Sequence, residues 1–237
     1  MPVILIKSMR CFSRKQARSE KLETKFEIVP VPTRILTHHD DIVEAIVEYG
    51  GDKIGPDDVV CVAESVVAIT QGGAKRSEDF KPGLLAKVLC RLFPSKGSIS
   101  GWHSMQALID AEGGMRVLIA VICGFAAKCV GISGVFYRMA GEQARLIDDV
   151  TGTMPPYDKH IVYGPHNPSK VAEEITSGTG AFGAAVADVN DLKRSCVLGV
   201  SKGVNADEVA QILIDNPFGN GSQKTPVVVI KNYRRAR

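Results

Sequence analysis

Two acidic clusters are the residues of this sequence best suited to chemistry. Asp148 and Asp149 are adjacent near the end of the segment 134–153, and Asp188 and Asp191 follow a run of small apolar residues. Neighbouring carboxylates repel each other, so a fold that partly buries them must supply a cation. Carboxylate oxygens suit Mg²⁺ or Mn²⁺, whose remaining positions are filled by water and phosphate oxygens. The alternative is that both clusters are solvated turn residues, because Asp is common in turns.

Glycine-bearing segments form a second group of candidates, because glycine lets backbone N–H groups approach an anion. Ser65 and Gly72 lie in a segment that follows a β-branched run and could cradle a phosphate, although the sequence contains no P-loop or dinucleotide-binding fingerprint. The alternative there is a plain turn. The long polar loop 215–226 is interpreted either as a solvent loop or as part of a nucleotide site, with these candidate residues: Gly219, Gly221 and Gln223.

Nucleophilic catalysis and zinc binding have little support. The sequence contains no cysteine beside a histidine and no CxxC pair. Four of the six cysteines lie in apolar segments, at Cys61, Cys90, Cys123 and Cys129. We therefore predict reduced, mostly buried thiols in a cytoplasmic protein.

The composition predicts a globular protein with a substantial core. Of 237 residues, 45% are hydrophobic and 23% are charged, and the net charge is only +3. Residues 1–25 and 233–237 are basic, and we interpret them as a disordered extension and a tail, so nucleic acid is not an expected partner. The most apolar stretch, 117–135, is interrupted by Lys128 and several small residues, which favours a buried helix over a membrane span.

Strands and helices alternate along most of the chain. Residues 26–36 read as an edge strand because they carry two prolines, 59–63 read as a strand buried on both faces, and 134–137 read as a short strand or turn. Further strands are expected at 161–163, 180–187, 196–200 and 227–230. Helices are expected after a cap at Asp40 or Asp41, at 81–93, 105–111, 115–130 and 168–175, and at 207–214 after a start at Asn205 or Asp207. The pattern predicts an α/β (mixed α+β) fold, a mixed sheet with packed helices. We expect a single two-lobed domain over 26–232, with a soft boundary near 152–160.

A set of weak motifs is spread over residues 26–232. They are Pro30-Val-Pro-Thr-Arg-Ile, Asp58-Val-Val-Cys-Val-Ala, Gln71-Gly72, Ile147-Asp148, the strand that leads to Asp188, and Thr225-Pro-Val-Val-Val-Ile. In this spacing the chain resembles the coenzyme F-420:L-glutamate ligase family, the gamma-glutamyl ligases of a deazaflavin coenzyme.

The resemblance implies a specific function. Enzymes of this family use GTP and Mg²⁺ or Mn²⁺ to activate a carboxylate as an acyl phosphate, which the amine of L-glutamate then attacks. Small-molecule substrates, namely glutamate and an acidic acceptor, and an α/β homodimer with its site at the subunit junction are therefore expected. Asp148 and Asp188 would be metal ligands, with Asp149 and Asp191 as neighbours that complete the shell.

The same resemblance suggests an alternative function. The family carries lysine and serine in the turn where this chain has Ser65 and Ile69, so basic groups expected against nucleotide phosphate are missing there. A catalytically altered paralogue that binds a nucleotide or cofactor is the second interpretation.

Overall fold

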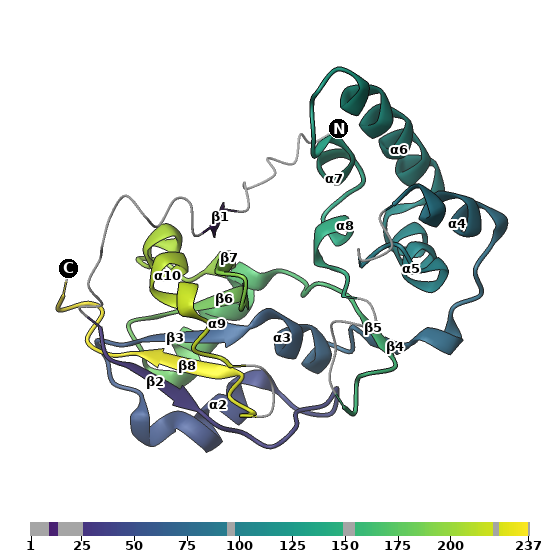
Figure 1. The fold of residues 1–237 in the computed structure, drawn as a ribbon. Coiled ribbons are helices and arrows are strands. Elements are labelled where there is room, and N and C mark those ends of the chain that lie inside the picture. The colour runs from purple at the N-terminus through teal and green to yellow at the C-terminus, as the bar shows by residue number, and fades with distance from the viewer. Residues whose placement is uncertain (1–9, 14–25, 94–97, 149–154, 220–222, 237) are drawn as a thin grey trace. The chain divides into compact units, whose positions relative to one another are not determined.

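The computed structural model describes residues 10–13, 26–93, 98–148, 155–219 and 223–236. The chain divides into two compact units, each with its own sheet (Figure 1). Unit 1 comprises Met1–Gln71 and Pro165–Arg237, and unit 2 comprises Gly72–Gly164. The soft boundary expected near 152–160 falls inside unit 2.

Unit 1 is built on a mixed six-stranded sheet in the order β1-β7-β6-β3-β8-β2. Only β3 and β6 pair in parallel, and the other neighbours are antiparallel. Its strands are β1 (Arg10–Ser13), β2 (Ile28–Val31), β3 (Val59–Ala63), β6 (Gly183–Asn190), β7 (Arg194–Val200) and β8 (Val227–Ile230). The mixed sheet confirms the predicted fold class, and β2, which contains Pro30, lies at an edge as expected.

Helices cover both faces of this sheet (Figure 1). Side chains alternate along a strand, so those of β3 reach the cores on both faces of the sheet. Val60 and Val62 pack in the core under α2 (Ile42–Gly50) and α9 (Pro168–Thr179), and Val59 and Cys61 pack in the core under α10 (Ala206–Ile212). Burial on both faces is why β3 reads as an unbroken apolar run. The helical segments of unit 1 are α2 (Ile42–Gly50), η1 (Gly51–Lys53), α3 (Glu64–Thr70), α9 (Pro168–Thr179), α10 (Ala206–Ile212) and η4 (Leu213–Asp215).

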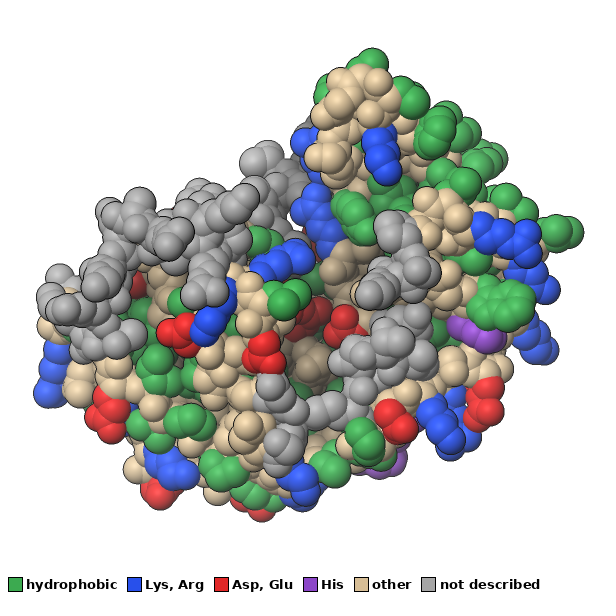
Figure 2. Space-filling model, in the orientation of Figure 1, with side chains coloured by type: hydrophobic (Ala, Val, Ile, Leu, Met, Phe, Trp, Pro, Cys, Tyr) green, Lys and Arg blue, Asp and Glu red, His purple; other side chains and the backbone are tan. Residues whose placement is uncertain are grey.

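Unit 2 is mainly helical, with a two-stranded antiparallel sheet of β4 (Ala74–Arg76) and β5 (His160–Val162). Met105, Leu108, Phe136 and Ile161 are among the residues of its core. Hydrophobic side chains also remain exposed on its helices (Figure 2). In the described part of the chain, no helix is long and apolar enough to cross a membrane. The helical segments are η2 (Ser77–Asp79), α4 (Leu84–Leu89), η3 (Cys90–Leu92), α5 (Trp102–Glu112), α6 (Gly114–Cys129), α7 (Val135–Met139) and α8 (Gln143–Leu146).

Three local predictions are wrong. The segment after β3 is a helix, α3, and not a turn, and α7 replaces the short strand or turn expected at 134–137. Both are short helices without a side-chain cap, so the usual start signal is missing from their sequences. Asp188 lies inside β6 instead of ending it, because β6 and β7 remain paired as far as Asn190.

The prediction of reduced cysteines is wrong for one pair. Cys11 in β1 and Cys196 in β7 are directly opposite each other and form a disulfide across a sequence separation of 185. The pairing of an edge strand with a residue so far along the chain has no local signature. Cys61 and Cys90 are buried free thiols, as expected, whereas the free thiol of Cys123 is half-buried and that of Cys129 is exposed.

Candidate functional site

The carboxyl end of the parallel pair β3 and β6 brings two acidic residues to one edge of the sheet. The register pairs Val59 with Gly183 and ends with Ala63 opposite Ala187. Glu64, the first residue of α3, and Asp188, which is still in β6, directly follow this last pair. Ligand sites of open α/β sheets lie at this kind of edge. We call Glu64 and Asp188 the acidic edge.

The carboxyls of the acidic edge are withdrawn from water. Glu64 is 9% exposed. Burial raises the pKa of the Asp188 carboxyl, and the positive charge of Arg194 opposes this effect only in part. An ionised carboxyl in such a place needs an opposite charge or hydrogen-bond donors, and perturbed carboxyls in clefts are typical of functional sites.

The glycine-bearing loop after η4 starts beside the second acidic cluster. Asn216 Nδ2 donates a hydrogen bond to Asp191 Oδ1 at 2.7 Å, and Lys193 forms an ion pair with Asp215. Asp191 itself is exposed in the turn between β6 and β7. The turn around Asp191 and the loop that contains Gly219 are two separate candidate sites in the sequence. A hydrogen bond and an ion pair link the turn to the start of the loop.

Two of the predicted nucleotide-binding residues lie against each other in this loop. Gly219 has φ +72°, a conformation that favours glycine, and a Cβ placed on it would be 2.8 Å from the end of the Gln223 side chain. The Thr225 hydroxyl donates to the Phe218 carbonyl at 2.6 Å and closes the loop before β8. The loop returns to the acidic edge, because Ala63 N donates to the Pro226 carbonyl at 2.9 Å. Gly221 lies outside the described residues.

Ser65 and Gly72 flank α3. Ser65 is half-buried in its first turn, and Gly72 follows the helix with φ +77°. The end of α3 is fixed by a pair of hydrogen bonds: Gln71 Nε2 donates to the His166 carbonyl at 3.0 Å, and His166 N donates to Gln71 Oε1 at 2.7 Å. This pair ties α3 to the loop that precedes α9.

Asp148 belongs to unit 2, where its backbone extends the small sheet. Its N–H donates to the Val162 carbonyl at 2.9 Å, and the Val162 N–H donates back at 3.0 Å. Ile147, the residue before it, is buried in the core of unit 2. This buried neighbour and the backbone pairing with Val162 together hold Asp148 in place. Asp149 lies outside the described residues.

The predicted metal ligands do not form a complete cation site within the described residues. Among them, no group of three or more His, Cys, Asp and Glu side chains could hold a metal ion. Asp148 lies in unit 2 and Asp188 in unit 1, so neither unit alone holds both predicted ligands.

Sequence reasoning missed Glu64 as a functional residue. It was treated as part of a turn, although an acidic residue directly after a β-branched strand is a usable signal. Its importance comes from the parallel register with Asp188, which lies 124 positions away in the sequence (188 − 64). Arg194, whose charge acts on Asp188, was missed as well.

Comparison with known proteins agrees with this geometry. A family model described as F420-0:Gamma-glutamyl ligase matches residues 30–187, about two thirds of the chain. The match contains β3, α3, Asp148 and the first part of β6, and it ends one residue before Asp188. No curated protein matches the chain.

Proposed function

Since this chain belongs to the F420-0:gamma-glutamyl ligase family, we propose that it joins L-glutamate through an amide bond to an acidic acceptor, with GTP as the energy source. Family membership supports gamma-glutamyl ligase activity in the biosynthesis of the F420 coenzyme. The use of GTP, the divalent cation and the acyl-phosphate intermediate are the finer parts of the proposal.

The proposed chemistry balances without a protein nucleophile. A carboxylate oxygen of the acceptor attacks the γ-phosphorus of GTP, and GDP leaves with the electron pair of the broken P–O bond. The glutamate amine then attacks the carbonyl carbon of the acyl phosphate, phosphate leaves, and the amine gives up a proton. The products are the amide, GDP and phosphate. Such a reaction depends mainly on positioning and electrostatics.

The half-buried Asp188, which shares the acidic edge with Glu64, is the observation that carries the proposal. Its carboxyl has a raised pKa because of burial, so a cation near it would lower the cost of its ionised form. Asp188 would be one ligand of Mg²⁺ or Mn²⁺, which would neutralise phosphate charge when bound. Gly219 and Gln223, in the loop that returns to the same edge, would supply N–H donors to the nucleotide.

The exposed apolar face of α6 supports the homodimer in this proposal. Met115, Ile119, Ile122 and Phe125 are 70%, 46%, 60% and 69% exposed. The helix carries only two charged residues, both basic, so two copies of this face could pack as a two-fold pair without burying a carboxylate. Sedimentation should show a dimer that Ile122→Asp converts to monomer. A wild-type protein that sediments as a monomer at micromolar concentration would contradict this part.

A second candidate function has its own supporting observation. Ile69, at a position where the family carries a basic group, is buried and 8% exposed, so no donor reaches a phosphate from there. A paralogue that binds a nucleotide or cofactor without turnover would be consistent with this loss.

The experiment follows phosphate release from GTP or ATP with Mn²⁺, L-glutamate and F420-0 or a related acidic acceptor. Release that needs both acceptor and glutamate, and that is lost in Asp188→Asn and Glu64→Gln, supports the ligase. Asp52→Asn, a change at an exposed residue of η1, is the matched control and should keep full activity. Nucleotide binding without release favours the second candidate, and full activity in Asp188→Asn refutes the role of the acidic edge.

A further inference from the structure

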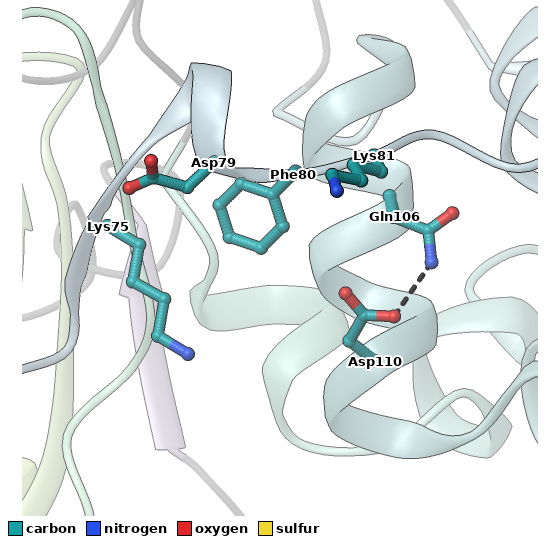
Figure 3. Close-up of a pocket in the computed structure, with 6 residues that line it drawn as sticks. All are labelled: Lys75, Asp79, Phe80, Lys81, Gln106 and Asp110. Atoms are coloured by element: carbon teal, nitrogen blue, oxygen red, sulfur yellow. Dashed lines mark hydrogen bonds between the residues drawn. The ribbon is translucent and has the colours of Figure 1, made fainter.

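A pocket lies in unit 2, apart from the residues considered above. It has a volume of about 470 Å³, within the range of small-molecule sites (Figure 3). Its walls come from β4, from η2 with the two residues that follow it, and from α5. The lining residues are Lys75, Asp79, Phe80, Lys81, Gln106 and Asp110.

The pocket contains charges of both signs that do not neutralise one another. Among the described residues, no ion pair within 4.0 Å joins Lys75 or Lys81 to a carboxylate. The Lys75 ammonium instead lies 5.5 Å from the centre of the Tyr163 ring. Elsewhere in unit 2, Arg76 and Arg116 do pair with acidic residues. Opposite charges held apart around one cavity suit a ligand that itself carries both signs.

The acidic side of the pocket is held in place. Gln106 Nε2 donates to Asp110 Oδ1 at 2.7 Å, and Gln106 Oε1 accepts from Gly83 N at 2.9 Å (Figure 3). The two residues are one turn apart on α5, so the carboxylate has a fixed direction. Burial, together with the negative charge of Asp110, raises the pKa of Tyr163 to about 12, so this neighbouring ring stays neutral.

The apolar part of the pocket is also well supported. Phe80 is 8% exposed, and its ring centre lies 6.4 Å from that of Tyr163. The hydroxyl of Tyr163 donates to the Ala107 carbonyl on α5 at 3.4 Å. These contacts place an aromatic surface between the charged groups, where the methylene carbons of a small ligand could lie.

We propose that this pocket binds a free α-amino acid with an acidic side chain. Asp110 would receive the ammonium group, and Lys75 and Lys81 would receive the two carboxylates. A polyphosphate would be repelled by the two aspartates, and a purely cationic ligand by the two lysines. The choice of L-glutamate as the occupant rests on the proposed ligase function, in which glutamate supplies the attacking amine.

The test measures binding of L-glutamate to the full chain by calorimetry, without nucleotide or acceptor. Saturable binding is expected for the wild type. It should weaken about tenfold or more in Lys75→Gln and in Asp110→Asn, because each change removes one charge-assisted hydrogen bond. Lys87→Gln, an exposed lysine on α4 outside the pocket, is the matched control and should bind like the wild type. Circular dichroism and the unfolding temperature establish that each variant is folded.

Two ligand comparisons make the result specific. Glutarate has both carboxylates but no ammonium, so it should bind about tenfold or more weakly than L-glutamate, and inorganic phosphate should not compete. Absence of glutamate binding, equal affinity for glutarate, or unchanged affinity in both folded variants would overturn the proposal.

The outcome is separable from that of the proposed function. If acceptor-dependent phosphate release occurs and its KM for glutamate is unchanged in Lys75→Gln, the pocket assignment fails while the ligase stands. If glutamate binds in the pocket but no acceptor supports phosphate release, the assignment stands while the ligase proposal fails.

Discussion

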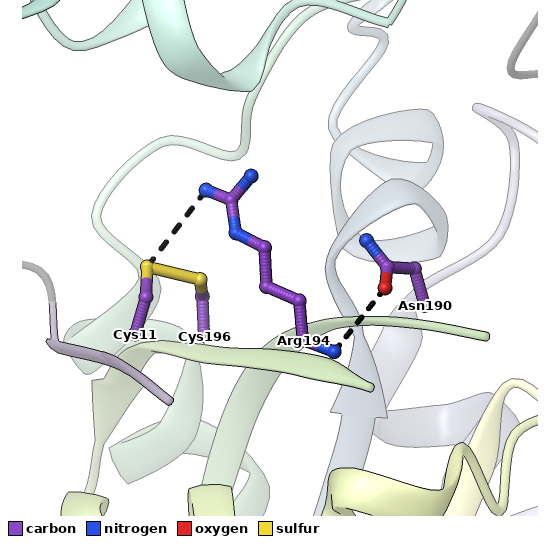
Figure 4. Close-up of a disulfide and its surroundings, with 4 residues drawn as sticks. All are labelled: Cys11, Asn190, Arg194 and Cys196. Atoms are coloured by element: carbon purple, nitrogen blue, oxygen red, sulfur yellow. Dashed lines mark hydrogen bonds between the residues drawn. A yellow bond between two sulfur atoms is a disulfide. The ribbon is translucent and has the colours of Figure 1, made fainter. Parts of the chain in front are cut away.

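Reducing the disulfide between Cys11 and Cys196 should markedly lower the stability of unit 1. The bond joins β1, a four-residue edge strand, to β7 (Figure 4). Cys196 is fully buried while Cys11 is exposed, so a reductant reaches the bond from the side of β1. Without the bond, this edge strand depends on its pairing with β7 and on its contacts with α10.

The magnitude follows from the length of chain that the bond closes. For a sequence separation of 185, the chain-entropy relation gives a loss of about 5 kcal/mol at 25 °C. Removal of native disulfides typically costs about 2–5 kcal/mol, so we expect a loss in that range. In a chain of 237 residues, each kcal/mol shifts the unfolding temperature by about 2–4 °C, which predicts a fall of roughly 5–20 °C.

The assay compares calorimetric unfolding of the wild type with and without a phosphine reductant, with thiol titration to establish that the bond is open. Cys11→Ser should match the reduced wild type and should not respond to the reductant. Cys129→Ser, which changes an exposed free cysteine, is the control and should unfold like the wild type. If the opened protein and Cys11→Ser unfold at the temperature of the oxidised wild type, the reasoning from loop closure is refuted.

The stability contributed by two carboxyls, the buried Asp58 and the half-buried Asp188, should respond to pH in opposite ways, and one glycine should resist replacement. Burial acts to raise the pKa of Asp58, but Lys231 and two backbone N–H groups outweigh burial and hold this pKa below 3.8. Asp58→Asn should therefore lower the free energy of unfolding by about 3–5 kcal/mol, measured in urea near pH 7. This loss should fade as the pH falls through the folded-state pKa of Asp58. Burial raises the pKa of Asp188 above 3.8, so its ionised form lowers the stability of the protein as the pH rises. Asp188→Asn should therefore raise the free energy of unfolding by on the order of 1 kcal/mol near pH 7. A loss of stability in this variant at pH 7 would contradict the desolvation of Asp188. Gly199→Ala should lower the free energy of unfolding by about 3 kcal/mol in the same assay, because its Cβ would lie 2.3 Å from a backbone nitrogen of α9. Gly51→Ala, where the nearest atom is 3.9 Å away, is the control and should be nearly neutral. Equal losses in the two variants would rule out the close approach of α9 to β7.

Local patterns predicted many elements correctly because each pattern carries its own physical cause. The β-branched run 59–63 is buried on both faces of a sheet, and its bounds are those of β3. Asp41 and Asn205, each one of two candidates for the start of its helix, accept hydrogen bonds from the first turns of α2 and α10. The edge position of β2 follows from a proline that cannot donate to a sheet ladder.

The candidate site was predicted less completely than the fold. Its single residues can be recognised from the sequence around them, but which of them lie together in space depends on contacts between distant segments. The sequence singled out Asp188, Gly219 and Gln223 individually, yet it treated Glu64 as a turn residue. Glu64 gains its place only from the parallel pairing of β3 with β6, a contact between segments more than 100 residues apart. The roles of Asp148 and Asp188 as metal ligands remain predictions.

The sequence by itself determined the class of fold, the strands and helices with strong periodicity, and, through its resemblance to a ligase family, the kind of reaction to consider. Hydrophobic periodicity and capping act over a few residues, so they can be read without a structure. The tertiary structure alone decided that Glu64 and Asp188 share one sheet edge, that Cys11 meets Cys196, and that charges of both signs line the pocket of unit 2. Each of these depends on strand register or on packing between distant segments, and no local pattern records such pairings.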